Sequence, residues 1–276
     1  MNKLTINAPS TEKTETVLLL HGATSVHDIW TPLLPLLPTN YRIIPLALPG
    51  HLDGEPVDLE LPVSMDSLSK KIVQEMQSQG IESAHVVGNS LGGWLALELA
   101  RCGFAESVTA FSPAGSWPNQ KAFLRIARAM VLACRVFPFL RPLFAPLMTF
   151  SAARRWLFAS QMRHGERISP TAAQRLLLGI CRCPVIPPLI TAFREDGPIR
   201  PLPGLGIPVN IVWSANDDVL PPAQFLTPMC EAVPSANFML LENAGHVPMY
   251  DQPAAMVKHI QQSIEQATTQ LITPAT

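Results

Sequence analysis

Ser90 is the residue whose surroundings in this chain most favour chemistry. It stands in Gly88-Asn89-Ser90-Leu91-Gly92, between the apolar run AHVV and the helix-like run WLALELA. A glycine inside a helix costs about 1 kcal/mol relative to alanine, so three glycines in six positions indicate an unusual backbone. The spacing G-x-S-x-G is typical of a strand that turns sharply into a helix with serine at the corner. The sequence therefore predicts an exposed hydroxyl at a helix N-terminus, where the N–H of Leu91 favours developing negative charge.

A base and a carboxylate that could activate this serine occur later in the chain. A serine hydroxyl is a weak nucleophile and needs a base that a carboxylate orients. His246 follows the apolar run NFMLL, and Asp217 and Asp218 follow VNIVW. The order serine, acid, histidine is one of those in which such triads occur. We therefore predict Ser90 as nucleophile and His246 as base, with the acid open between the two aspartates.

The elements that must position these residues alternate between strand-like and helix-like runs. Such alternation is typical of a parallel sheet covered by helices, so the fold class is α/β. The pattern is interrupted after residue 115 and resumes near residue 207, which places both halves in one sheet, and a helix from about 253 to 267 closes the chain. The expected strands are 16–22, 41–50, 84–90, 108–115, 207–218 and 237–246, with helix-like stretches at 26–37 and at 65–80, the second entered through Ser64 or Asp66.

The intervening segment 115–200 differs in pattern and charge. Its helical patterns are broken by prolines, and it shows no strand-like alternation. It holds 13 basic residues against 3 acidic ones, a net charge of +10, whereas the rest of the chain holds 7 basic and 18 acidic residues, a net charge of −11. We predict a core of residues 1–114 and 201–276 and an inserted helical, basic cap of residues 115–200.

Composition limits location and partners. The N-terminal sequence MNKLTINAPSTEKTE lacks the apolar segment of a secretory signal, and no uncharged apolar run reaches the roughly 18 residues of a membrane helix. Five cysteines, odd in number and mostly isolated, suit a reducing compartment, so we expect a cytoplasmic protein. The histidines outside the proposed triad show no metal-site spacing, and neither a metal nor an organic cofactor is expected. We also expect no nucleic-acid partner, because no stacking motif or recognition helix is evident.

Four motifs together resemble the α/β-hydrolase superfamily, of the kind that carries a helical cap: LLLHGA, GNSLGG, WSANDDVLPP and NAGHVPMYDQP. The resemblance covers about residues 14–114 and 205–265, and it implies an α/β-hydrolase fold with a mostly parallel central sheet flanked by helices. The family's acid stands four positions before a proline, which matches Asp217 with Pro221 and leaves Asp218 in the loop. The family's oxyanion hole implies the backbone N–H groups of Ala23 and Leu91.

Three further positions near these motifs, His21, His51 and Asp251, are not assigned to the chemistry. His21, in the HG pair, is expected to shape its loop. The loop around His51 departs from the family's usual P-G-H-G-x-S, and Ala47 stands where an aspartate is common, so that loop's usual contacts are not carried over. Asp251, two residues before Pro253, is expected near the N-cap of the last helix.

The leading interpretation is a serine hydrolase, a carboxylesterase that cleaves an ester or thioester with a hydrophobic acyl part through an acyl-enzyme on Ser90. One alternative is a C–C bond hydrolase of the ring-cleavage type, which Asn89 before the serine weakly supports. The other is a ligand receptor that keeps a hydrolase fold without catalysis.

The cap suggests what binds there. Residues 121–150 mix arginines with large apolar residues at roughly helical spacing, so the apolar face is expected to line a substrate pocket. The positive charge favours an acidic carrier protein, a coenzyme A thioester or an anionic membrane surface as partner. Carrier-protein methyl esterases resemble this core and have basic cap surfaces. The oligomeric state and the identities of the acyl and leaving groups stay open.

Overall fold

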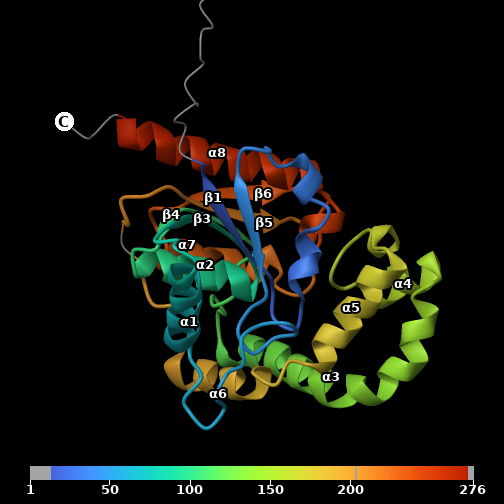
Figure 1. Cartoon of the computed structure of the whole chain (residues 1–276). Coiled ribbons are helices and arrows are strands. Elements are labelled where there is room, and N and C mark those ends of the chain that lie inside the picture. Colours follow the sequence, from blue (N-terminus) through green and yellow to red (C-terminus); the bar gives the residue numbers. More distant parts are fainter. Residues whose placement is uncertain (1–13, 203, 273–276) are drawn as a thin grey trace, which may run out of the picture.

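Six parallel strands form the central sheet of the described part of the chain (Figure 1). The computed structural model describes residues 14–202 and 204–272, so most of the N-terminal stretch used to exclude a secretory signal lies outside it. The strand order is β2-β1-β3-β4-β5-β6, and the predicted parallel α/β sheet is confirmed. The strands are β1 (Thr16–Leu20), β2 (Arg42–Leu46), β3 (Ala84–Asn89), β4 (Ala105–Phe111), β5 (Val209–Ser214) and β6 (Asn237–Leu241).

The strands are shorter than the runs that predicted them, because each apolar run continues into the following loop. The largest shift of a strand's start is at β4, which begins at Ala105 rather than at residue 108. Ala84 pairs with Ala105 and His85 with Ser107, so Glu106 is the extra residue of a β-bulge. Since Glu106 and Ser107 are polar, a search for apolar runs misses the start of this strand.

Helices cover both faces of the sheet, namely α1 (Met65–Ser78), α2 (Leu91–Arg101), α7 (Pro222–Ala232) and α8 (Pro253–Ile272). In β1, Leu18 and Leu20 belong to the apolar cluster that contains α1, α2 and α7 residues, whereas Val17 and Leu19 belong to the cluster that contains α8 residues. The two-residue period of a strand produces this division. Because both faces are buried, the strand reads as one continuous apolar run.

The two helix-like stretches before β3 have different outcomes. α1 begins after Ser64, whose Oγ accepts from Ser67 N at 3.1 Å while Ser67 Oγ accepts from Ser64 N at 2.9 Å, a reciprocal cap. The stretch 26–37 does not form an α-helix, because Pro32 and Pro35 lack the N–H groups that would extend one. It forms two short 3-10 helices instead, at His27–Trp30 and Leu34–Leu36.

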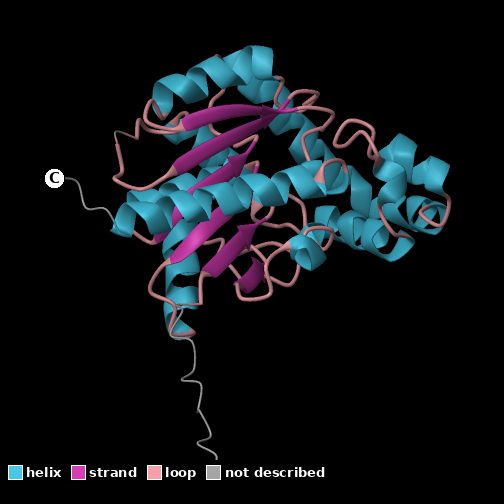
Figure 2. Cartoon of the chain, turned by 90° about the horizontal axis from the view of Figure 1, so that it is seen from above, coloured by secondary structure: helices cyan, strands magenta, loops and turns pink. Residues whose placement is uncertain are grey.

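Four helices between β4 and β5 form the cap, which lies to one side of the sheet (Figure 2). The expectation that prolines break this segment is wrong for its first helix, which runs for 28 residues through Pro138, Pro142 and Pro146. These prolines are four residues apart and exposed, so water can satisfy the carbonyls that lose an N–H partner, and the helix curves (Figure 1). The cap helices are α3 (Gln120–Leu147), α4 (Ser151–Leu157), α5 (Pro170–Cys181) and α6 (Ile186–Asp196).

Candidate active site

Ser90 lies at the corner between β3 and α2. Its φ of 56° and ψ of −115° form a conformation that residues other than glycine rarely adopt. A side chain on Gly88 would overlap the backbone of Gly92, and a side chain on Gly92 would overlap the carbonyl of Leu20. A Cβ on Gly93 would also lie only 3.0 Å from a neighbouring loop. The three glycines therefore permit the sharp turn that presents the Ser90 hydroxyl.

Asp217 and His246 come together from the loops after β5 and β6. Asp217 Oδ2 lies 2.7 Å from His246 Nδ1, and both side chains are buried. The other carboxylate oxygen accepts from Val219 N at 2.9 Å and Leu220 N at 2.7 Å, which fixes its orientation. Because the carboxylate is an acceptor, it places a proton on Nδ1 and leaves Nε2 as the basic nitrogen.

Asp218 takes no part in this contact. Asp218 is exposed and borders the cavity that Ser90 and His246 also line. The two neighbouring aspartates therefore face different environments, one buried against the imidazole and one at the solvent-accessible margin.

Asn89 joins the serine corner to the histidine loop. Its Nδ2 donates to the carbonyl of His246 at 2.9 Å and to the carbonyl of Phe111 at 3.1 Å, and its side chain is buried. Sequence reasoning weighed Asn89 only as weak support for a C–C hydrolase. Its positioning contact was missed, because His246 is 157 residues away and no local pattern connects the two residues.

Two backbone N–H groups stand free beside the serine. A Cβ on Gly22 would lie 3.3 Å from Ser90 Cβ, so the loop that carries Ala23 runs alongside the serine. Within residues 14–202 and 204–272, neither Ala23 N nor Leu91 N donates a hydrogen bond, and both residues line the cavity. Unpaired amides at this place can stabilise negative charge on an oxygen that forms next to Ser90.

His21 shapes the loop that leads to Ala23. Its Nε2 accepts from Leu48 N at 3.1 Å, while Nδ1 lies 2.8 Å from the carbonyl of Gly22. Burial holds the pKa of His21 well below its ordinary value, and the nearby His51 lowers that pKa further. A neutral imidazole with its proton on Nδ1 satisfies both contacts, so His21 supports the loop and stays away from the proposed proton transfers.

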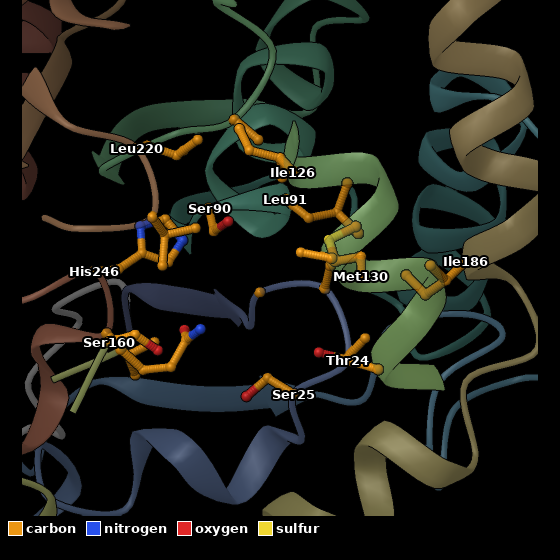
Figure 3. Close-up of a pocket in the computed structure, with 18 of the residues that line it drawn as sticks. Thr24, Ser25, Ser90, Leu91, Ile126, Met130, Ser160, Ile186, Leu220 and His246 are labelled. Carbon is orange, nitrogen blue, oxygen red and sulfur yellow. The ribbon is translucent and has the colours of Figure 1, made fainter. Parts of the chain in front are cut away.

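Ser90, Leu91 and His246 open into a cavity of about 510 Å³ between the core and the cap (Figure 3). Its walls are predominantly apolar, and the polar residues that line it include Ser25, Arg125 and Ser160. The expectation that the apolar face of residues 121–150 lines a pocket agrees with this arrangement. The cap contributes Phe123, Ile126, Met130, Phe137, Leu176, Leu177, Ile186, Leu189 and Phe193 among others.

The cap is tied to the histidine loop through Asp251, for which an N-cap role was expected. The buried Asp251 carboxylate accepts from Gly245 N at 2.9 Å, Arg163 N at 3.0 Å and His164 N at 2.8 Å. Its carboxylate therefore does not cap the last helix but joins two segments more than 80 residues apart. Asp251 does lie at the entry of α8, as expected, but its hydrogen-bond partners depend on tertiary packing and the local pattern Asp-x-Pro does not predict them.

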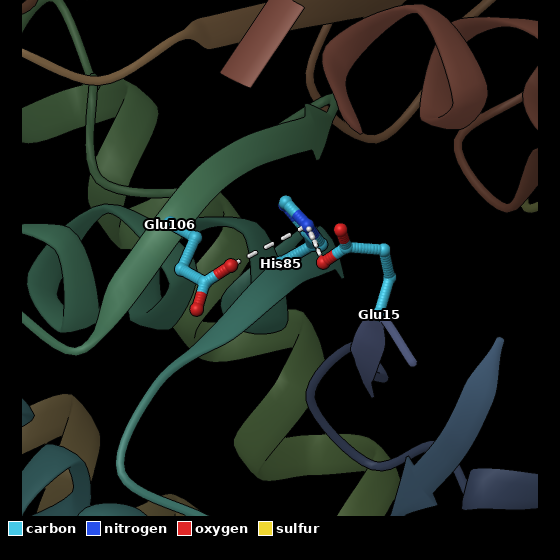
Figure 4. A group of neighbouring side chains, drawn as sticks. All are labelled: Glu15, His85 and Glu106. Atoms are coloured by element: carbon cyan, nitrogen blue, oxygen red, sulfur yellow. Dashed lines mark hydrogen bonds and ion pairs between the residues drawn. The ribbon is translucent and has the colours of Figure 1, made fainter. Parts of the chain in front are cut away.

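A second group of ionisable side chains lies at the opposite end of the strands. His85 Nε2 is 3.0 Å from Glu15 Oε2 and 3.6 Å from Glu106 Oε2, while its Nδ1 is 2.9 Å from Ser107 Oγ (Figure 4). These residues lie near the starts of β1, β3 and β4, whereas Ser90 and His246 follow strand ends. Ligands of parallel α/β sheets bind at the carboxyl ends of the strands, so this cluster is separate from the candidate active site.

The fold and the site define a class of α/β protein with a serine at the strand-to-helix corner and a helical cap over it. A model of the alpha/beta hydrolase family matches residues 17–259, and the chain belongs to that family. It is thus a hydrolase of the α/β superfamily, as the resemblance implied.

Individual relatives differ in the activity that their names give. Epoxide hydrolase EphH of Mycobacterium tuberculosis is 30% identical over 206 residues, which are 72% of this chain and 94% of that protein. Monoacylglycerol lipase ABHD6 of Bos taurus is 23% identical and aligns with 88% of this chain and 73% of its own. A solved esterase from Thermogutta terrifontis matches with a TM-score of 0.69 and 19% identity, covering 92% of this chain and 90% of its own, and so shares the fold.

No single helix in the described ranges is long and apolar enough to cross a membrane. The pair α5 and α6 passes by length and composition but is bent by 63° at the break between the two helices. Residues of both helices line the cavity.

Proposed function

We propose that this chain hydrolyses carboxylic esters with a hydrophobic acyl part through an acyl-enzyme on Ser90. One observation carries the proposal: the Ser90 hydroxyl, the Asp217-oriented His246 and two unpaired backbone N–H groups all adjoin one predominantly apolar cavity. A nucleophile, a base and an anion-stabilising pair are the groups that acyl transfer needs.

Each group has a defined step. His246 Nε2 takes the proton of Ser90 as its oxygen attacks the ester carbonyl, and the N–H groups of Ala23 and Leu91 stabilise the resulting oxyanion. Collapse expels the alcohol, which receives the proton from His246. Water then gives a proton to His246 and attacks the acyl-serine, which releases the acid and restores the hydroxyl. The Asp217 carboxylate stabilises the imidazolium that forms in both halves of the reaction, acylation and deacylation.

A serine nucleophile favours esters over epoxides as substrates, although the name of one relative is epoxide hydrolase. If the Ser90 hydroxyl opened an epoxide, the product would be an ether, which water does not cleave under mild conditions. An acyl-serine is an ester and can be hydrolysed by the same base that formed it. Turnover through Ser90 therefore requires an acyl substrate.

The cavity supports a hydrophobic acyl part. Its volume of about 510 Å³ falls within the usual range for small-molecule sites, and apolar cap side chains face Ser90 across it (Figure 3). Met130 lies on the face of α3 that borders this space. An acyl chain entering from Ser90 would replace water against these side chains, which favours binding in proportion to the apolar area covered.

Labelling with a fluorophosphonate, followed by intact-protein mass spectrometry, tests the nucleophile. We expect one adduct on the unsubstituted chain and on Ser160→Ala, and none on Ser90→Ala. Ser160 is a matched control, because it lines the same cavity without occupying the corner. Labelling that survives in Ser90→Ala, or an unsubstituted chain that neither labels nor turns over p-nitrophenyl esters, would contradict the proposal.

Turnover of p-nitrophenyl esters from acetate to laurate tests the acyl site. Met130→Trp should move the optimum to shorter chains, because the larger side chain fills cavity space. Val136→Trp, on the exposed side of the same helix, should leave the optimum unchanged. Equal shifts in both variants would show that the chain does not lie along the inner face of α3.

A further inference from the structure

The outer side of α3 exposes apolar side chains at helical spacing. Leu132, Val136, Phe139, Leu143 and Leu147 follow one another at intervals of three or four residues, so they share one face. Phe139 is 84% exposed and Leu143 is 65% exposed. A surface helix usually presents polar residues to solvent, and a large exposed apolar patch indicates an interaction site.

Two further large apolar side chains are exposed in and just before α4. Phe150 and Trp156 are 63% and 70% exposed. Trp156 stacks on Phe144 of α3 with ring centroids 6.4 Å apart, and Phe144 in turn stacks on Phe137 at 5.8 Å. Phe137 lines the cavity and Phe144 is seven residues further on, so these contacts pack α4 against the inner side of α3. We call the outward face of α3, formed by Leu132, Val136, Phe139, Leu143 and Leu147, the outer cap face.

Cations accompany this apolar surface. Arg128 and Arg135 on α3 are exposed and form no ion pair with any residue that the structure describes. Other cap arginines are already engaged: Arg175 pairs with Asp28 and Asp53, and the buried Arg154 donates to backbone carbonyls. The outer cap face thus combines aromatic and leucine side chains with unpaired positive charge.

We propose that the outer cap face binds the surface of an anionic lipid bilayer. Apolar and aromatic side chains enter the boundary between headgroups and acyl chains, while the long arginines reach lipid phosphates. A second copy of the chain is a poorer occupant, because a two-fold contact would place Arg128 and Arg135 of both copies in one interface, and α3 and α4 carry no acidic residue to pair with them. An acidic protein would match the charge and leave most of the exposed apolar area without a partner.

The two sides of α3 connect this surface to the cavity. Ile126, Met130 and Phe137 line the cavity from the inner side, and Phe139 and Leu143 face outward. A helix is about 10 Å across, so docking by the outer face holds the cavity wall roughly one helix diameter from the lipid. The binding itself does not depend on the proposed esterase activity, whereas entry of a lipid ester from the bilayer into the cavity rests on that function.

Cosedimentation with vesicles tests the surface. The chain carries Ser90→Ala so that lipid hydrolysis plays no part, and the vesicles contain either phosphatidylcholine with phosphatidylglycerol in equal parts or phosphatidylcholine alone. We expect binding to the mixed vesicles and weaker binding, by about tenfold or more, to the neutral ones. Replacing Leu132, Phe139 and Leu143 with Gln should weaken binding to mixed vesicles by at least about tenfold. Arg128→Gln with Arg135→Gln should remove most of the preference for anionic vesicles.

Leu61→Gln is the matched control, because Leu61 is 63% exposed but lies outside the cap. It should bind mixed vesicles as the parent does, and circular dichroism should show all variants folded. Three outcomes would overturn the proposal: no cosedimentation of the parent, equal binding by the triple variant and the control, or a dimer in light scattering that the triple variant dissociates. Retention of an acidic carrier protein without vesicle binding would likewise assign the face to a protein. Fluorophosphonate labelling of Ser90 reports separately on the proposed hydrolase.

Discussion

The carboxylate of Asp217 lies 2.7 Å from His246 Nδ1, while the neighbouring Asp218 is exposed at the margin of the cavity. In Asp217→Asn, the amide can donate to Nδ1, which favours the wrong imidazole tautomer. We expect kcat to fall by about 10⁴-fold, with the fold retained. Stopped-time assays with a p-nitrophenyl ester measure this loss, and Asp218→Asn should retain most activity. Equal losses in the two variants would remove Asp217 from its assigned role.

Asp251 should contribute more to the stability of the fold than an exposed aspartate does. Its buried carboxylate accepts three backbone N–H groups from the cap and the histidine loop, and Asn at this site would turn an amide N–H toward at least one of them. We expect Asp251→Asn to lower the free energy of unfolding in urea by roughly 2 kcal/mol. Asp58→Asn is the control, since Asp58 accepts one exposed N–H, and a similar effect at both sites would argue against the clamp.

Gly88 should not tolerate a methyl group. A Cβ there overlaps the backbone of Gly92, which cannot move without opening the corner that holds Ser90. Gly88→Ala should therefore destabilise the fold by roughly 3 kcal/mol or more and should abolish fluorophosphonate labelling. Gly204→Ala, where nothing lies within 4 Å of the added carbon, should melt at the parent's temperature. Normal stability and labelling in Gly88→Ala would show that the corner is less constrained than the structure indicates.

His51 should make the fold sensitive to acid. Burial lowers the pKa of His51 from 6.5 to about 4, so the unfolded chain binds a proton at pH values where the folded chain does not. Stability is therefore complete above about pH 6.5 and falls as the pH drops toward about 4, by about 1.4 kcal/mol per pH unit from this residue. Urea unfolding across that range should give a shallower pH dependence for His51→Asn. An unchanged slope would mean that folding does not lower the pKa of His51.

Local patterns explain why much of the fold was predictable. Buried parallel strands read as apolar runs. The glycines around Ser90 indicate the sharp turn, because a side chain at their positions would overlap the backbone. The errors came where local signals mislead. The exposed prolines of α3 are tolerated because water reaches the freed carbonyls, and the polar start of β4 is hidden by the bulge at Glu106.

The sequence by itself determined the order of the elements, the serine corner and the presence of an acid and a histidine after later strands, because each depends on near neighbours in the chain. Only the tertiary structure decided that Asp217 contacts His246, that Asn89 and Asp251 hold the histidine loop, and that α3 turns one apolar side to the cavity and another to solvent. These contacts join residues far apart in the sequence, so tertiary packing determines which side chains come together.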